Sequence, residues 1–179
     1  MTRNAGNILL ISGTGRNTGK TTVSCKLIDA FKHLQVVAVK ISPHFHKQPN
    51  NIPLAESKGK YQIFKETLRN TGKDSSRMLD AGASSVFYIQ CNKNSLPEAF
   101  KKVNEYISAT SPVICESGGL SGYIKPGLHI LMHSGKDNET KKLSETPDIV
   151  FEFSPEKFEL NTSEFSFTDG KWIYKNLAL

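Results

Sequence analysis

Apolar runs rich in β-branched residues alternate along the chain with segments whose apolar residues recur every three or four positions. The runs predict buried strands, and the three-to-four-residue period predicts helices. Their alternation is typical of an α/β domain with a mostly parallel sheet flanked by helices. The predicted strands span 8–12, 36–41, 86–89, 113–115, 129–132 and 149–153, and the predicted helices span 19–33, 61–69, 76–81 and 96–108.

Two further segments complete this organisation of residues 1–179 as one domain. The polar segment 42–60 contains three prolines and predicts a mobile loop. Near the end, the runs 165–168 and 171–174 flank Asp169-Gly170, and an Asp-Gly pair between two strand-like runs predicts a β-hairpin over 165–174.

Composition narrows the setting of the protein. No apolar stretch reaches the length of a membrane span, and Cys25, Cys91 and Cys115 are an odd number without metal-ligand spacing. We expect these cysteines to be small buried apolar residues in a cytoplasmic protein. The net charge of +6 suits phosphate ligands, an acidic protein partner or a solvated surface. The lysines are scattered, which disfavours nucleic acid as a partner.

Residues 13–22 join the first predicted strand to the first predicted helix and are rich in glycine. A strand, a glycine-rich loop and a helix in this order are the setting of a phosphate-binding P-loop. Thr14 stands where a glycine is usual, so the loop is one residue longer than the common form. The residues predicted to bind the nucleotide are Gly13, Thr14, Gly15, Arg16, Asn17, Thr18, Gly19, Lys20, Thr21 and Thr22.

The residue types in this loop suit a triphosphate. Backbone N–H groups of the loop and of the helix N-terminus point at one spot, where the helix dipole favours an anion. Lys20 adds positive charge for the outer phosphates, and the Thr21 hydroxyl can ligate Mg²⁺. The loop therefore predicts binding of GTP or ATP with Mg²⁺, and the alternative is an ordinary glycine-rich turn that ends in Lys-Thr.

Two carboxylates are candidates for the Mg²⁺ side of the site. Glu116 ends an apolar strand, where a charge is costly unless an ionic partner meets it, and in P-loop enzymes that partner is Mg²⁺ with its water shell. Asp74 either caps the helix that follows it or approaches Mg²⁺ or the attacking water, with Lys73 or Arg77 on phosphate. We thus predict Lys20, Asp74 and Glu116 as catalytic residues and Thr21, Glu116 and Asp74 as metal ligands.

The remaining candidates concern a second ligand and the base. His44 and His46 follow the second predicted strand and could face the nucleotide or a second substrate, or be solvated; a metal site is disfavoured because no further ligand lies at suitable spacing. The Asn-Lys-x-Asp pattern that reads guanine is missing, since 92–95 lacks the Asp. The adjacent Lys136 and Asp137 are a candidate for a degenerate substitute of that pattern.

Several of these features occur in one order: the loop 13–22, the strand 36–41 leading into a His-bearing loop, the run Gly72-Lys73-Asp74-Ser75-Ser76-Arg77 with Ala81-Gly82-Ala83 behind it, and the strand ending at Glu116. In this the chain resembles the molybdopterin-guanine dinucleotide biosynthesis protein B family of small P-loop GTP-binding proteins. The resemblance implies a cytoplasmic homodimer that binds GTP with Mg²⁺ and hydrolyses it slowly. It also implies a protein client, the partner that attaches a nucleotide to molybdopterin in molybdenum cofactor biosynthesis.

Two departures from that family keep other functions open. Ser117-Gly118-Gly119-Leu120 follows Glu116 where the family has one Gly and a bulky residue, and the segment 42–60 is longer than in the family. The Glu-Ser-Gly-Gly sequence and the longer P-loop resemble dethiobiotin synthetase-like ligases. The alternatives are therefore an ATP-dependent small-molecule ligase or kinase, or a nucleotide-dependent binding module without hydrolysis.

Overall fold

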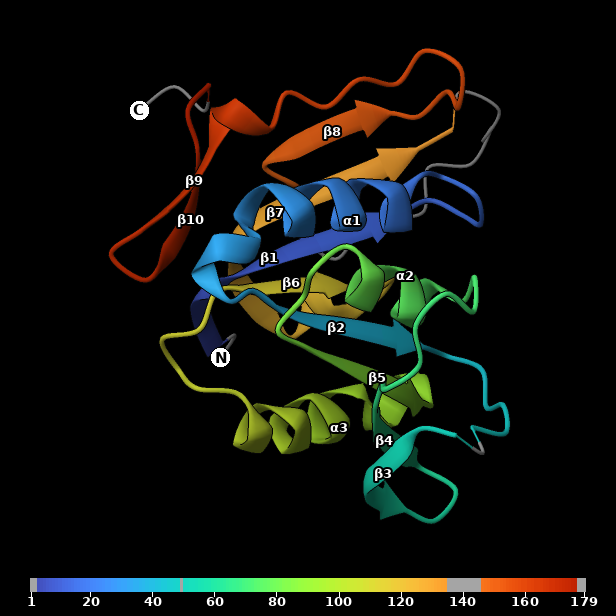
Figure 1. The fold of residues 1–179 in the computed structure, drawn as a ribbon. Coiled ribbons are helices and arrows are strands. Elements are labelled where there is room, and N and C mark those ends of the chain that lie inside the picture. The colour runs from blue at the N-terminus through green and yellow to red at the C-terminus, as the bar shows by residue number, and fades with distance from the viewer. Residues whose placement is uncertain (1–2, 49, 135–145, 177–179) are drawn as a thin grey trace.

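An eight-stranded sheet with the order β3-β4-β5-β2-β6-β1-β7-β8 forms the centre of the protein (Figure 1). The computed structural model describes residues 3–48, 50–134 and 146–176 of the 179-residue chain. The strands from β5 to β8 in this order are parallel. β4 pairs antiparallel with β5, and β3 pairs antiparallel with β4. The strands are β1 (Arg3–Gly13), β2 (Val37–Ser42), β3 (Ile52–Ser57), β4 (Tyr61–Lys65), β5 (Ser85–Cys91), β6 (Val113–Glu116), β7 (Ile124–His133) and β8 (Ile149–Glu152).

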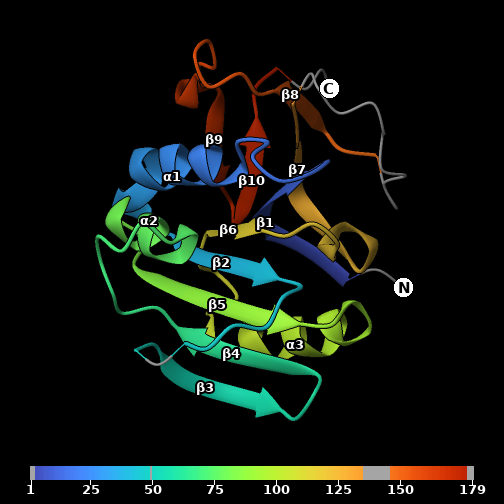
Figure 2. The ribbon, with the colours of Figure 1, turned by 90° about the vertical axis from the view of Figure 1, so that its right-hand side faces the viewer.

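Helices cover both faces of the sheet (Figures 1 and 2). Because side chains alternate along a strand, Leu9 and Ile11 of β1 pack in the core under α1 and α2, whereas Leu10 packs in the core under α3. The helices are α1 (Lys20–Phe31), α2 (Asp74–Asp80) and α3 (Leu96–Val103), with 3₁₀ turns at Lys32–Leu34, Lys93–Ser95, Asn104–Tyr106, Leu120–Gly122 and Thr162–Glu164. No helix in the described part of the chain is long and apolar enough to cross a membrane.

The fold class predicted from the sequence is confirmed: the protein is α/β, with a mostly parallel sheet, flanking helices and a C-terminal hairpin of β9 (Phe165–Thr168) and β10 (Lys171–Tyr174). All six predicted strands are present, and β1 and β7 are longer than predicted. The predicted helix over 96–108 ends earlier, at Val103, and continues as a 3₁₀ turn.

The predictions for residues 42–69 are partly wrong. The segment 61–69, predicted as a helix, begins with strand β4, and the predicted loop 42–60 contains strand β3. Tyr61 and Phe64 are spaced like one face of a helix, but Gly59, at φ 72°, turns the chain so that β3 and β4 pair as a hairpin. β3 lies at the sheet edge with Ile52 half exposed, so its burial pattern carries little apolar periodicity.

The hairpin β9–β10 packs against the face of the sheet that α1 and α2 cover. It lies at the amino ends of the parallel strands, far from their carboxyl ends (Figure 1). Its Trp172 is buried, with 2% of its surface exposed, and the indole N–H donates to the carbonyl oxygens of Asn7 and Val113, at 3.1 Å each. The Trp172 ring also meets Phe31 of α1 edge-on. A single side chain thus joins the hairpin to β1, β6 and α1.

Trp172→Ala should lower the free energy of unfolding by about 3–5 kcal/mol, the usual cost of deleting a large buried aromatic side chain. Urea denaturation followed by circular dichroism measures the change. Ile173→Ala on the same strand is the matched control, because Ile173 is 45% exposed. Equal effects of the two substitutions would contradict the anchoring role of Trp172.

Candidate functional site

The parallel register brings three chain segments to one edge of the sheet. Glu116, the last residue of β6, is paired with Ile11 of β1 on one side and with Lys40 of β2 on the other. The glycine-rich loop 13–22 leaves the carboxyl end of β1 at this same edge. Ala38 faces the core under α1 and α2, and by strand alternation Lys40 points to that face as well.

The loop 13–22 depends on glycine at Gly19, the residue before α1. Its φ of 83° is left-handed, and a Cβ there would lie 2.2 Å from the ring of Phe153. Asn17 also has a positive φ, 57°, which asparagine adopts more readily than most residues. Gly19 therefore allows both the loop conformation and the close approach of the segment after β8.

Lys20 lies over the loop. Its ammonium donates to the carbonyl oxygen of Gly15 at 2.6 Å and to the hydroxyl of Thr18 at 3.0 Å. A Cβ on Gly13 would lie 2.5 Å from that hydroxyl and 2.9 Å from the Lys20 side chain. The absence of a side chain at Gly13 thus lets the cation lie close to the loop at the N-terminus of α1.

Carboxylate oxygens from two elements accept hydrogen bonds from a second ammonium group, that of Lys40. Lys40 donates to Glu116 Oε1 and to Asp74 Oδ2, the latter at 2.8 Å, while Thr21 Oγ1 donates to Glu116 Oε2 at 2.8 Å. Glu116 is 2% exposed, so its charge depends on these partners. Arg77 lies 3.8 Å from the other Asp74 oxygen. Thr21, Asp74 and Glu116, predicted as metal ligands, therefore lie together.

The pKa values of Lys40 and Asp74 are both shifted by their ion pair. Burial lowers the pKa of the Lys40 ammonium, but the Glu116 and Asp74 carboxylates raise it by more, so that it lies above its ordinary value. Burial raises the pKa of the Asp74 carboxyl, but the Lys40 ammonium and the Thr21 hydroxyl lower it by more, to below its ordinary value. The capping alternative for Asp74 is not supported, because α2 begins at Asp74 itself and has Lys73 as its N-cap residue.

A cavity of about 510 Å³ opens beside this cluster. Its size suits a small-molecule ligand. Phe153 and Pro155, in the segment after β8, supply an apolar part of its wall. The cavity is lined by Gly15, Arg16, Asn17, Thr18, Gly19, Lys20, Thr21, Thr22, Lys40, Asp74, Arg77, Glu116, Phe153 and Pro155.

The donor set at this cavity fits a hard divalent cation. Among the described residues no group of three or more His, Cys, Asp and Glu side chains could hold a metal ion. Mg²⁺ at phosphate sites usually takes one or two carboxylates, with phosphate oxygens and water completing its shell. The hydroxyl of Thr21 and the carboxylates of Glu116 and Asp74 match that smaller requirement.

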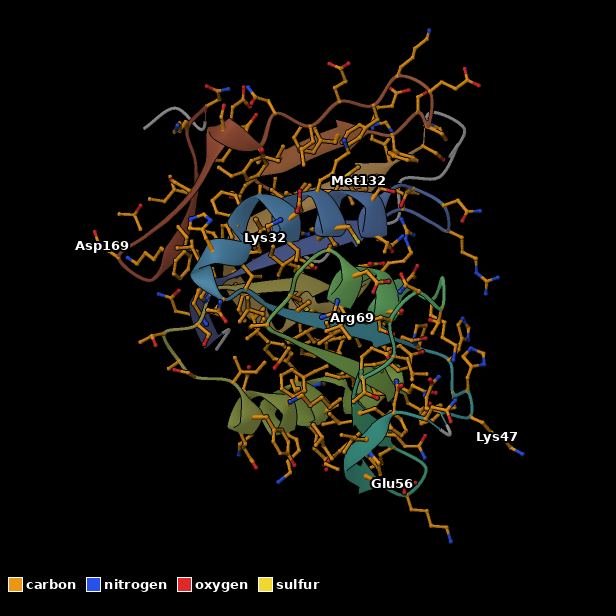
Figure 3. All side chains as sticks on the ribbon, viewed as in Figure 1. Lys32, Lys47, Glu56, Arg69, Met132 and Asp169 are labelled. Atoms are coloured by element: carbon orange, nitrogen blue, oxygen red, sulfur yellow. The ribbon has the colours of Figure 1, made fainter. Side chains whose placement is uncertain are left out.

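The two predicted loop histidines do not line the cavity. His44 and His46 are exposed in the loop after β2, with ring centroids 6.3 Å apart. The buried side chain of Gln90 holds the backbone of this loop, accepting from His46 N–H and donating to His46 C=O at 2.9 Å. Lys47 of the same loop extends away from the body of the protein (Figure 3).

The surroundings of the three cysteines suit unreactive, structural thiols. Burial raises the pKa of the Cys25 and Cys91 thiols to about 11 and also raises that of Cys115. All three side chains are free thiols, and Cys91 and Cys115 are buried. These thiols therefore stay protonated at neutral pH, as expected for small apolar residues.

Three residues of the site, Lys40, Phe153 and Pro155, are not indicated by the sequence motifs. Lys40 could have been found, because it is the one charged residue in the run 36–41 and it precedes the predicted carboxyl end. Phe153 and Pro155 carry no such signal, since they reach the cavity only through the packing of β8 at the side of β7. Lys136 and Asp137, the predicted substitute for a guanine-reading pattern, lie outside the described residues.

Asp74→Asn should lower the free energy of unfolding at pH 7, and the difference from the parent should shrink as the pH falls below about 4. Asp74 is ionised above its ordinary pKa in both states, and its lowered pKa in the folded state contributes stability there. That contribution is lost as the pH falls through the folded-state pKa. Urea unfolding at several pH values measures it, with Asp169→Asn at the hairpin turn as the control. Ordinary carboxyl groups become protonated as the pH falls to about 2.5. A difference in the free energy of unfolding between parent and Asp74→Asn that stays constant over this range would contradict the ion pair.

In comparisons with known proteins, no family model matches this chain, and no curated protein or solved structure matches it significantly. The functional assignment therefore depends on the geometry of the site and on the sequence motifs.

Proposed function

We propose that this protein binds a nucleoside triphosphate with Mg²⁺ in the cavity at the carboxyl edge of the sheet and hydrolyses it slowly. One observation carries the proposal: a single cavity is lined by a glycine-rich loop, the N-terminus of α1, a loop lysine and a cluster of two carboxylates with a hydroxyl. Of the ligands considered from the sequence, a triphosphate with a divalent cation uses all of these groups.

The loop 13–22 is the proposed phosphate site. The N-terminus of α1 carries no acidic residue in its first turn, so its dipole and its first backbone N–H groups favour an anion. Lys20 lies within the loop and supplies a positive charge that can exchange the Gly15 carbonyl for a phosphate oxygen. Loop and lysine together thus suit the β- and γ-phosphates of a P-loop protein.

Thr21, Glu116 and Asp74 are the residues that would hold Mg²⁺. When bound, the ion would neutralise charge on the transferred phosphoryl group. Lys40 forms ion pairs with the same two carboxylates. The ammonium of Lys40 is then close enough to the cluster to offset charge on a phosphate, and Glu116 or Asp74 would orient the attacking water.

The apolar wall of Phe153 and Pro155 is the proposed contact for the nucleobase, because it lies in the same cavity as the phosphate site. GTP as the natural nucleotide, a dimeric state, a cytoplasmic location and an accessory role in molybdopterin guanine dinucleotide biosynthesis extend the proposal from the sequence resemblance. In that role the client would be a protein.

A second candidate is an ATP-dependent small-molecule ligase or kinase. It is favoured by the loop after β2, whose backbone is fixed at His46 by Gln90 while the side chains of His44 and Phe45 stay exposed. An experiment that separates the two functions measures turnover of GTP and ATP after adding cell extract. The extract is first divided by dialysis into a macromolecular and a dialysable fraction. A rate raised by the macromolecular fraction supports the accessory factor, and a rate raised by the dialysable fraction supports the ligase.

Lys20→Ala should weaken triphosphate binding at least tenfold, since a charge-assisted hydrogen bond contributes about 1.5–3 kcal/mol. Calorimetric titration with non-hydrolysable GTP and ATP measures the affinity. Lys26→Ala on the exposed face of α1 is the matched control and should bind as the parent does. Unchanged affinity in Lys20→Ala for both nucleotides would refute the phosphate site.

Glu116→Gln should keep nucleotide binding and lower Mg²⁺-dependent hydrolysis by roughly 100-fold, the scale of losing one preorganised electrostatic group. Phosphate release at saturating nucleotide measures the rate, and a circular-dichroism melt checks the fold. Hydrolysis at the parent's rate would remove Glu116 from the site. A collapsed melt would show a structural role instead.

A further inference from the structure

Glu66, directly after β4, is a buried carboxylate outside the cavity. It is 3% exposed and accepts four hydrogen bonds, shared evenly between its two oxygens. Oε1 accepts from the N–H groups of Thr67 at 3.0 Å and Leu68 at 2.9 Å. Oε2 accepts from Asn51 Nδ2 at 3.2 Å and from Ser75 Oγ at 2.6 Å. All four donors are neutral groups, and their hydrogen bonds offset the cost of burying this polar side chain.

The bond to Ser75 reaches the first turn of α2, one residue beyond Asp74. α2 has only seven residues, and a helix this short is marginal without tertiary contacts. Its first turn carries Asp74, whose carboxylate meets Lys40. The position of that carboxylate therefore depends on whatever holds the turn, and Ser75 is buried against Glu66.

The same carboxylate fixes the chain on its other side. Asn51 immediately precedes β3, and Thr67 Oγ1 donates to the carbonyl oxygen of Asn50 at 3.2 Å. Glu66 thus joins the start of β3, the end of β4 and the start of α2. The hairpin β3–β4 gives this junction a rigid base, because β4 pairs with β5 in the main sheet.

We infer that Glu66 is a positioning residue for Asp74: through Ser75 it holds the first turn of α2 so that the Asp74 carboxylate faces Lys40 and Glu116. The role of this placement, to present Asp74 to Mg²⁺ and triphosphate, rests on the proposed function. The contact itself is a property of the protein without nucleotide.

Ser75→Ala tests the inference, and Ser76→Ala is its matched control. Both serines are buried in the same turn, but the Ser76 hydroxyl accepts from Thr71 N–H and has no bond to Glu66. In nucleotide-free protein, Ser75→Ala should speed hydrogen exchange of residues 74–81 about tenfold, the scale of one hydrogen bond to a charged group, and Ser76→Ala should not.

The second measurement is the gain in affinity that Mg²⁺ gives to a non-hydrolysable triphosphate. Ser75→Ala should reduce this gain roughly fivefold or more, while binding without Mg²⁺ stays at the parent level, because one charge-assisted hydrogen bond supports the placement of Asp74. In an Asp74→Asn background, Ser75→Ala should reduce it no further. Glu66→Gln should behave as Ser75→Ala does.

Equal effects of Ser75→Ala and Ser76→Ala on exchange would overturn the inference, as would an undiminished effect of Ser75→Ala in the Asp74→Asn background. If Glu66→Gln does not fold, the comparison of Ser75→Ala with Ser76→Ala still tests the positioning role of Glu66. If the parent binds no triphosphate, the proposed function fails, and the exchange experiment still tests the hold of Glu66 on α2.

Discussion

The parallel pairing of β6 between β1 and β2 is the constraint on which the site depends. It places the end of each strand beside the next, so that Glu116 lies between the start of the glycine-rich loop and Lys40. Parallel strands end at a common edge, and loops that follow them converge there. Lys40, Glu116 and the glycine-rich loop are distant in sequence, and the register of these three strands brings them together.

Ion pairs stabilise the charged side chains at this edge of the sheet. Glu116 is buried, and a buried carboxylate without partners would be costly. Lys40 offsets it and extends to Asp74, which belongs to a different element and is held from behind by the hydrogen bonds of Glu66. The loop lysine, Lys20, is bonded separately to its own loop. The two lysines of the site therefore have different hydrogen-bond partners.

The sequence predicts the parallel core well because β2, β5 and β6 are short, apolar and β-branched, and such runs have few alternatives. It also predicts the hairpin 165–174 from Asp169-Gly170, both of which have positive φ. It does not predict β3, which is an exposed edge strand, or β4, whose Tyr61 and Phe64 are spaced like one face of a helix. Likewise Thr21, Asp74 and Glu116 could be named from local context, whereas Phe153 reaches the cavity only through tertiary packing.

Trp172 is the only tryptophan of the chain, and its surroundings make its fluorescence a reporter of the folded core. The indole is buried among Phe31 and Phe167, in the hairpin at the amino end of the sheet. Asp169 at the tip of that hairpin and Lys47 in the loop after β2 lie at opposite sides of the view in Figure 3. Intrinsic fluorescence will therefore follow loss of the core and remain nearly silent to events at the cavity, so that stability and ligand occupancy can be read in separate optical channels.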